Sequence, residues 1–275
     1  AALYKLRIAL ELKRGLSMVA GDIGTGKTTL ARRLSQILFQ DERVDFHLIL
    51  NPLYADEKQF LTWLVRNFSI DVWSGIDPAR SDILELRDAF EKFLIQKAVE
   101  ERQTVTLIID EAQKLDMAML ETLRVLLNFE TNEFKLLQLV LLAQVELYPK
   151  IAHMPNFMDR ISFKYTLNPL DARETRELIH FRVKTAGYNS RMELFLDEAV
   201  SEIYNYTRGY PRKITKLCHQ VLKELILQNK HAVDRMLIRD VIAKEEQYKL
   251  GGLEFGQNIN PPSGQSRIAG HGFGQ

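Results

Sequence analysis

Gly21-Asp22-Ile23-Gly24-Thr25-Gly26-Lys27-Thr28, followed by Thr29, matches the pattern G-x-x-x-x-G-K-[ST] at every fixed position. An apolar strand pattern over residues 16–20 precedes it, and a helical pattern over residues 28–40 follows it. Glycines let the backbone turn without Cβ clashes, and the turn directs N–H groups and a helix N-terminus towards one point. A tight glycine turn in an unrelated α/β protein is the alternative, against which Lys27-Thr28 argues. The stretch predicts a nucleoside triphosphate site that uses residues 21–29.

The pattern also predicts separate roles for the last residues of this loop. We expect Lys27 to reach the β- and γ-phosphates of ATP, and Thr28 to place its hydroxyl on Mg²⁺. Thr29 is a candidate for contact with the α-phosphate, or for a plain position in the first turn of the helix.

Two acids follow an apolar strand pattern at residues 104–109. Ligands of open parallel sheets bind at the carboxyl ends of the strands. We therefore expect Asp110 to hold the Mg²⁺ and Glu111 to orient and polarise the attacking water. The alternative is a pair of acids that cap the next helix. An acid that polarises water also separates hydrolysing ATPases from kinases of small molecules.

Three further polar residues complete the candidate site. Gln144 ends the strand pattern at residues 136–143, where its side chain would face the γ-phosphate. Arg160 precedes the last strand pattern and is a candidate arginine finger towards a neighbouring subunit, or a surface arginine paired with Asp159. Arg212, after the turn Gly209-Tyr210-Pro211, is a candidate sensor of the nucleotide or a solvent-exposed arginine at a helix start.

Strand and helix patterns alternate through the first part of the chain. Nearly continuous apolar strands that alternate with helices predict an α/β fold with a parallel sheet covered on both faces. The strand patterns fall at 16–20, 44–50, 104–109, 136–143 and 161–167, and the helical patterns at 2–14, 28–40, 56–68, 81–101, 116–129 and 145–153.

The pattern changes after Pro169. Helical patterns at 171–186, 196–207, 211–229 and 234–248 contain no strand between them. We therefore expect a nucleotide-binding core at 1–169 and an all-helical lid at 170–249. Glycine and proline become frequent towards the end, which predicts a flexible tail at 250–275.

Bulk composition limits the class of protein. The 275 residues carry a net charge of +1, which neither demands nor excludes a nucleic-acid partner. Cys218 is the only cysteine, so no intramolecular disulfide forms, in agreement with a reducing cytoplasm. No stretch reaches the roughly 18 apolar residues that a membrane helix needs. The chain does not begin with Met, so we expect a fragment or a trimmed chain.

Several motifs occur together in one order: GDIGTGKTT, LIIDEAQKL, LVLLAQVEL, MDRI and RGYPRKITKLC. In this combination the chain resembles AAA+ ATPases of the ExeA/GspA type, and it is also similar to transposition ATPases of the TniB/TnsC type. The resemblance covers about residues 1–249.

The resemblance implies an αβα core with strand order 5-1-4-3-2, a helical lid, and ATP bound at a subunit interface. It assigns Lys27 and Thr28 to Walker A, and Asp110 and Glu111 to Walker B. It further assigns sensor 1 to Gln144, the candidate finger to Arg160 and sensor 2 to Arg212. Asn51 matches a polar position that the family shows after its second strand.

Two functions follow as hypotheses. One is an ATPase motor for envelope secretion or assembly, a homo-oligomeric ring or filament in the cytoplasm or at the cytoplasmic face of the inner membrane, with secretion components as partners. The other is an ATPase that assembles on duplex DNA and recruits a transposase, with the loop at residues 131–135 as a contact. A small-molecule kinase is a third reading, which leaves Arg160 and Arg212 unexplained.

Overall fold

The structure is a computed structural model that describes residues 2–190 and 192–254, with side chains up to Gln247. It consists of two compact units. The first contains Ala1–Asp171 together with Arg208–Lys213, and the second contains Ala172–Thr207 and the chain from Ile214 on. The first stretch of the first unit ends at Asp171, two residues after the predicted domain boundary at 169. The segment Arg208–Lys213 belongs with the first unit, although the sequence placed it in the lid.

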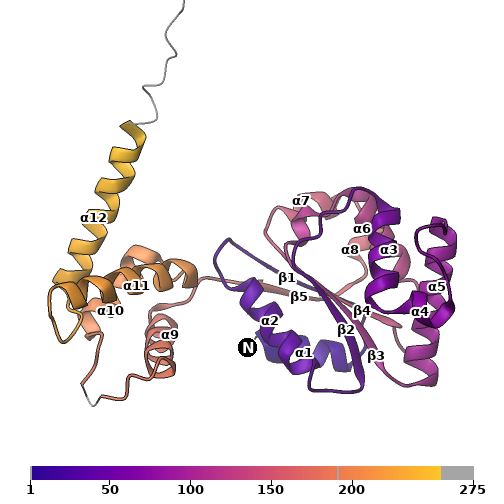
Figure 1. Cartoon of the computed structure of the whole chain (residues 1–275), viewed down its shortest axis with the longest axis horizontal. Helices are drawn as coiled ribbons and strands as arrows, with labels where there is room; N and C mark the ends of the chain where they lie inside the picture. The colour runs from indigo at the N-terminus through magenta and orange to yellow at the C-terminus, as the bar shows by residue number, and fades with distance from the viewer. Residues whose placement is uncertain (1, 191, 255–275) are drawn as a thin grey trace, which may run out of the picture. The chain divides into compact units, whose positions relative to one another are not determined.

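A five-stranded parallel sheet forms the centre of the first unit, in the order β2-β3-β4-β1-β5 (Figure 1). This confirms the predicted α/β fold and its strand order. The strands are β1 (Leu16–Gly21), β2 (Val44–Ile49), β3 (Thr104–Ile109), β4 (Leu137–Ala143) and β5 (Ile161–Leu167).

The central strands are apolar along their whole length because both faces of the sheet are covered. Every residue of β1 and β4 is buried, and β3 is buried from its second residue on. The edge strand β5 instead alternates between half-buried and exposed residues. A fully covered parallel strand has no solvent side that would favour polar residues.

Helices cover the two faces of the sheet in separate groups (Figure 1). On one face, α1 (Ala2–Glu11) and α2 (Lys27–Leu38) pack Leu6 and Leu34 against Val140. On the other face, a larger core contains Phe60, Phe90 and many further apolar side chains. Its helices are α3 (Glu57–Asn67), α4 (Ile70–Ser74), α5 (Ile83–Ile95), α6 (Met117–Leu126), α7 (Leu147–Ala152) and α8 (Pro155–Met158).

Aspartates at the helix starts fix where several helices of the larger core begin. Asp56, Asp82 and Asp116 each accept a hydrogen bond from the backbone N–H three residues on. At α5 the bond is reciprocal, because Glu85 accepts from the backbone of Asp82 and forms a capping box. The helix predicted at 81–101 ends in a π-helical segment, η1 (Gln96–Glu100). A 3₁₀ turn, η2 (Ala112–Lys114), was not predicted.

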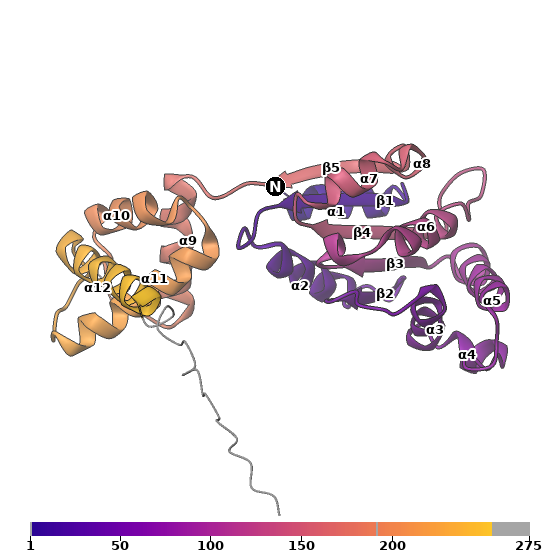
Figure 2. The same ribbon diagram turned by 90° about the horizontal axis from the view of Figure 1, so that it is seen from above.

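The second unit is helical, and Figure 2 shows its helices packed on one another. It contains α9 (Ala172–Thr185), α10 (Asp197–Thr207), most of α11 (Pro211–Leu227) and α12 (Arg235–Glu254). Apolar side chains such as Ile203, Val221 and Leu237 form its interior. The helix α12 continues past residue 250, where the tail was predicted to begin. The rest of that predicted tail, residues 255–275, lies outside the described residues.

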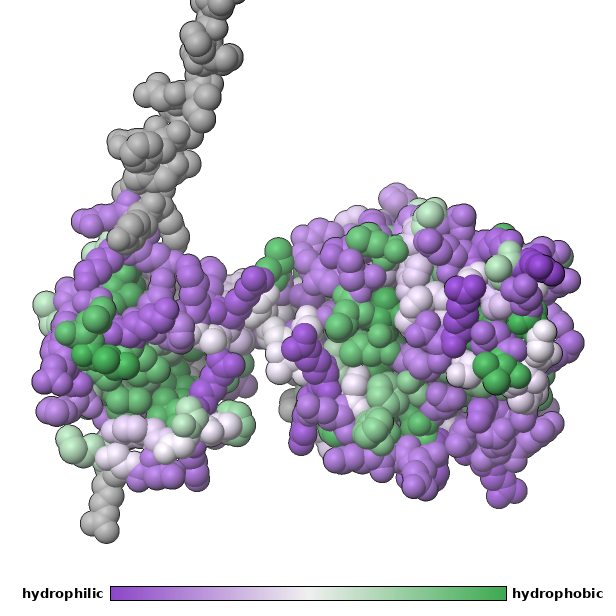
Figure 3. All heavy atoms as spheres, viewed as in Figure 1, coloured by the Kyte–Doolittle hydropathy of each residue, from purple (hydrophilic) through white to green (hydrophobic). Residues whose placement is uncertain are grey.

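Apolar side chains also reach the surface of both units (Figure 3). Tyr4 on α1 and Leu12 just after α1 are more than half exposed, and Phe181 on α9 is 68% exposed. Single exposed apolar residues such as Tyr4 are normal for a globular surface. Phe181 instead lines a hollow of the helical unit together with other apolar residues. Within the described part of the chain, none of the helices has the length and apolar content required to cross a bilayer.

Candidate functional site

The loop between β1 and α2 depends on glycine at several positions. Gly24 and Gly26 have φ angles of +85° and +104°, a region that other residues adopt only at a cost. At Gly21 a Cβ would lie 2.7 Å from the carbonyl oxygen of Leu167 and 2.9 Å from Thr25 Oγ1. The close approach of β5 and the curl of the loop therefore both exclude a side chain there.

Lys27 lies inside this loop. It is only 6% exposed, and its Nζ donates to the carbonyl oxygens of Gly21 at 2.7 Å and Asp22 at 2.8 Å. Burial lowers the pKa of Lys27, while the negative charges of Asp110 and Glu111 act in the opposite direction. The loop thus holds a desolvated ammonium group beside two carboxylates, an arrangement suited to polyanionic phosphate.

The start of α2 supplies further donors. Gly26 is its N-cap and has no side chain to cap the helix, and the first bond of the turn runs from Leu30 N to Gly26 O. The N–H groups of the first turn of a helix have no partner within that helix. They attract an anion, and the dipole of the helix adds to that attraction. Thr28 and Thr29 lie in this turn with exposed side chains.

Thr28 and Asp110 meet across the sheet edge. Thr28 Oγ1 donates to Asp110 Oδ2 at 2.6 Å, although the residues are 82 positions apart in the sequence. Asp110 is 1% exposed, and its Oδ1 accepts the N–H of Glu111 at 2.9 Å. A hydroxyl and a carboxylate oxygen are hard ligands of the kind that Mg²⁺ binds.

The donor set also fits a metal that arrives with its substrate. Among the described residues, no group of three or more His, Cys, Asp or Glu side chains could hold a metal ion. Mg²⁺ in phosphoryl-transfer sites keeps several waters and takes only one or two protein ligands beside phosphate oxygens. The pair of Thr28 and Asp110 fits that requirement.

Glu111 follows Asp110 in a left-handed backbone conformation, with φ 55° and ψ 33°. Its Oε2 accepts from Gln113 Nε2 at 2.9 Å and lies 3.5 Å from Lys114 Nζ. Lys114 Nζ also donates to Asn51 Oδ1 at 3.0 Å. The side chain of Glu111 is therefore held on its own turn, next to the end of β2.

Gln144 lies directly after β4, the strand between β3 and β1. The register pairs Ala143 with Ala20 and Leu141 with Ile109, so the three central strands end at one edge. The backbone N–H of Gln144 donates to Gln113 Oε1 at 3.0 Å. Gln113 was missed by the sequence reasoning; its place in Asp-Glu-Ala-Gln is the only signal that could have identified it.

Arg212 lies beside the loop. Its backbone N–H donates to Gly24 O at 3.3 Å, and its Cβ would lie 3.1 Å from a Cβ added to Gly24. Two residues earlier, Tyr210 Oη donates to Asp22 Oδ2 at 2.8 Å. The side chain of Arg212 is exposed. Tyr210 is a second neighbour of the loop that the sequence reasoning missed.

Arg160 lies at the amino ends of the strands, whereas the loop lies at their carboxyl ends. It directly precedes β5, whose Ile161 pairs with Leu16 at the start of β1. The pKa of Glu130 is lowered mainly by its hydrogen bond from Lys135, with a smaller contribution from Arg160. Arg160 Nε is buried without a hydrogen-bond partner among the described residues. The structure therefore places the loop, the acidic pair, Gln144 and Arg212 at the carboxyl ends of the strands, and Arg160 at their amino ends.

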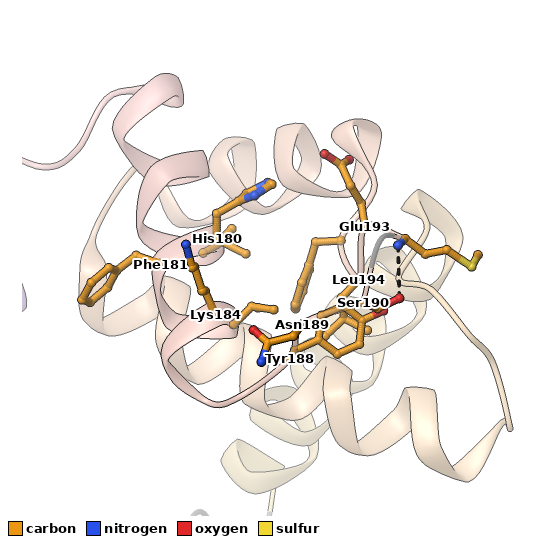
Figure 4. Close-up of a pocket in the computed structure, with 12 residues that line it drawn as sticks. His180, Phe181, Lys184, Tyr188, Asn189, Ser190, Glu193 and Leu194 are labelled. Atoms are coloured by element: carbon orange, nitrogen blue, oxygen red, sulfur yellow. Dashed lines mark hydrogen bonds between the residues drawn. The ribbon is translucent and has the colours of Figure 1, made fainter.

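A separate hollow of about 410 Å³ lies in the helical unit. Figure 4 shows His180, Lys184 and Glu193 at its rim, and Ser190 Oγ accepting from Met192 N at 3.1 Å. None of the candidate site residues lines this hollow. The chemistry-bearing groups lie at the sheet edge instead.

Residues 11–151 match the family described as "AAA domain". This stretch, just over half of the chain, contains the phosphate-binding loop, the acidic pair and Gln144. The chain therefore belongs to the AAA domain family of P-loop NTPases.

Within that family, the chain is 30% identical over 236 residues to "General secretion pathway protein A" of Aeromonas hydrophila. The predicted resemblance to AAA+ ATPases of the ExeA/GspA type is thereby confirmed. The match covers 84% of this chain and 41% of the relative, so the chain spans about two fifths of that protein.

Solved structures share the fold. They include Cdc6p from Pyrobaculum aerophilum (TM-score 0.65, 16% identity, 88% of this chain and 66% of that chain). The Drosophila ORC bound to DNA has a TM-score of 0.65 at 17% identity, over 94% of this chain and 63% of that chain. The ORC2 protein of Aeropyrum pernix in its ADPNP–ADP complexes has a TM-score of 0.59 at 17% identity, over 88% and 66%. Identities this low establish the fold alone.

Proposed function

We propose that this protein binds ATP with Mg²⁺ and hydrolyses it to ADP and phosphate. The observation that carries the proposal is the hydrogen bond from Thr28 to Asp110 at the mouth of a loop that encloses Lys27. It places a hydroxyl, a carboxylate and a cation at one sheet edge, with Glu111 as the next residue. A small-molecule kinase would not need that second acid.

Each residue has a separate part in the proposed reaction. Lys27 and the N–H groups of the loop bind the phosphates. Thr28 and Asp110 would hold Mg²⁺, which would supply positive charge to neutralise the γ-phosphate. Glu111 accepts a hydrogen bond from the attacking water and orients it in line with the bond that breaks. Gln144 and Arg212 contact the γ-phosphate side of the site.

We propose further that the protein works as a homo-oligomer. The position of Arg160 supports this, because it lies at the sheet edge opposite its own loop. Strands rise about 3.3 Å per residue, so a strand of this length separates the two edges by roughly 20 Å. Arg160 then acts as a finger only on the nucleotide of a neighbouring subunit, in a ring or in a filament.

The proposed client is an envelope secretion or assembly system. The similarity to general secretion pathway protein A supports this choice. The protein would then act in the cytoplasm or at the cytoplasmic face of the inner membrane, with secretion components as partners.

A second candidate function is assembly on duplex DNA with recruitment of a transposase. One observation favours it. Two basic residues, Lys13 and Arg102, line a hollow next to Thr131 and Phe134, which belong to the loop expected to touch DNA. Phosphate contacts release counterions, so binding through them falls steeply with salt. Fluorescence anisotropy of a labelled duplex across a salt series distinguishes the candidates: ATP-dependent, salt-sensitive binding supports the DNA function, and its absence supports the secretion function.

The experiment that tests ATP hydrolysis compares Glu111→Gln with Lys27→Ala. We expect Glu111→Gln to bind ATP normally and to lose roughly 100-fold or more in turnover, because the water loses its base. We expect Lys27→Ala to bind ATP roughly 100-fold more weakly, because a charge-assisted hydrogen bond is worth about 3 kcal/mol. Phosphate release and isothermal titration measure the two effects. Normal turnover by Glu111→Gln would contradict the assigned role.

A further inference from the structure

The side-chain amide of Gln113 connects two strands of the site. Its Nε2 donates to Glu111 Oε2 at 2.9 Å, and its Oε1 accepts the backbone N–H of Gln144 at 3.0 Å. The second bond spans 31 positions of sequence. One half-buried side chain thus joins the end of β3 to the end of β4.

The hydrogen bonds themselves fix the orientation of this amide. A backbone N–H only donates, so the atom that faces Gln144 must be the amide oxygen. The NH₂ group then faces the side-chain oxygen of Glu111, which accepts its hydrogen bond. Exchanging the oxygen and nitrogen of Gln113 would break both bonds at once, so the network selects a single arrangement.

The turn that carries Gln113 is anchored on both sides. Ala112 and Leu115 are fully buried in the core. Lys150 Nζ, from α7, donates to the carbonyl oxygens of Gln113 at 2.6 Å and Leu115 at 3.0 Å. The backbone of Gln113 is therefore held while its side chain bridges the two strands.

We propose that Gln113 is a positioning residue, which sets the carboxylate of Glu111 relative to the end of β4 at Gln144. This inference rests on the proposed ATP hydrolysis. A water between Glu111 and Gln144 has to meet both groups at once, and errors of about 1 Å in such placement cost roughly 100-fold in rate. The two hydrogen bonds of Gln113 therefore fix the position of the Glu111 carboxylate relative to the end of β4.

Two substitutions test the two hydrogen bonds of Gln113. Gln113→Leu removes both hydrogen bonds and keeps a side chain of similar size. Gln113→Glu keeps an acceptor for the N–H of Gln144 but places a second carboxylate against Glu111, and like charges repel. The matched control is Gln40→Leu, the same change at an exposed residue after α2.

For both Gln113 variants we expect kcat to fall roughly tenfold while the Kd for ATP stays within about twofold, because a group that positions the base is lost and the phosphate contacts remain. Thermal unfolding of each variant accompanies the kinetics. A loss confined to stability, an unchanged kcat or a raised kcat would overturn the proposal.

A double-mutant cycle with Glu111→Gln completes the test. If Gln113 acts through Glu111, Gln113→Leu has no further effect on the residual turnover of Glu111→Gln. Independent, additive losses would overturn the inference. Wild-type turnover by Glu111→Gln would overturn the proposed role of Glu111 and this inference together. A stalled Glu111→Gln with an unaffected Gln113→Leu would overturn the inference alone.

Discussion

At the scale of single residues, the position of Arg212 depends on Gly209, a residue without a side chain. Gly209 has a φ of +75°, and a Cβ there would lie 1.8 Å from the carbonyl oxygen of Leu170. The two residues also share a hydrogen bond, from Leu170 N to Gly209 O at 2.9 Å. A backbone atom cannot move aside as a flexible side chain can, so the segment that brings Tyr210 and Arg212 to the loop requires glycine.

We expect Gly209→Ala to destabilise the protein by about 2–3 kcal/mol, from left-handed strain and from the clash together. It should also weaken ATP binding, because Arg212 moves away from Gly24. Gly187→Ala is the matched control: Gly187 has a φ of +93°, but no atom lies within 4 Å of an added Cβ. That change should cost only roughly 1 kcal/mol. Chemical denaturation and ATP titration measure both effects, and equal losses for the two variants would refute the role of the clash.

At the scale of elements, the helices behind the site begin where a side chain satisfies their first N–H groups. The capping box of α5 joins Asp82 Oδ1 to the N–H of Glu85 at 2.8 Å, and the N–H of Asp82 to Glu85 Oε2 at 3.0 Å. The same helix carries Phe90 and Phe93 into the larger core. Its start therefore sets the register of aromatic packing behind β3.

We expect Asp82→Ala to lower the free energy of unfolding by about 1 kcal/mol, the usual worth of an N-cap. Asp88→Ala, on the same helix, removes only an exposed pair with Lys92 and should cost a few tenths of that, about 0.3 kcal/mol. Denaturation midpoints and amide hydrogen exchange over the first turn of α5 make the comparison. Equal midpoints for the two variants would show that the capping box contributes little.

At the scale of the whole molecule, the sheet separates the two kinds of candidate residue. The loop, the acidic pair and Gln144 lie at its carboxyl edge, and Arg160 lies at its amino edge. A closed set of head-to-tail contacts between copies could bring these edges together. The proposed ATPase would then be complete only as an assembly.

Mixing two inactive variants tests this proposal. Arg160→Ala keeps Glu111, and Glu111→Gln keeps Arg160, so a mixed contact restores one complete site. Random mixing in equal amounts should recover about a quarter of the wild-type rate, because one contact in four has the required order. Phosphate release, with the assembly followed by light scattering, measures the recovery. A rate equal to the mean of the separate variants would contradict a finger that acts between subunits.

Much of the fold was predictable because its signals are local. The strand bounds at 104–109 and 161–167 match the prediction, since a buried parallel strand is a continuous apolar run and an edge strand alternates. The helices α4 and α8, of five and four residues, were missed because they are too short to show a period. The same distinction applies to the candidate site. The loop and the acidic pair were predicted because each is a local sequence pattern. Gln113 and Tyr210 were missed because their contacts join residues far apart in the sequence.

The sequence by itself determined the AAA+ fold, the strand order and the residues of the phosphate-binding loop. The loop and the alternation of strands and helices follow from short-range patterns, namely the spacing of glycines and the runs of apolar residues. The AAA+ fold and the strand order followed from the resemblance to ATPases of the ExeA/GspA type. Only the tertiary structure decided that Thr28 bonds Asp110 and that Gln113 joins Glu111 to Gln144. Those relations depend on sheet register and side-chain direction between distant residues, and no local pattern encodes them.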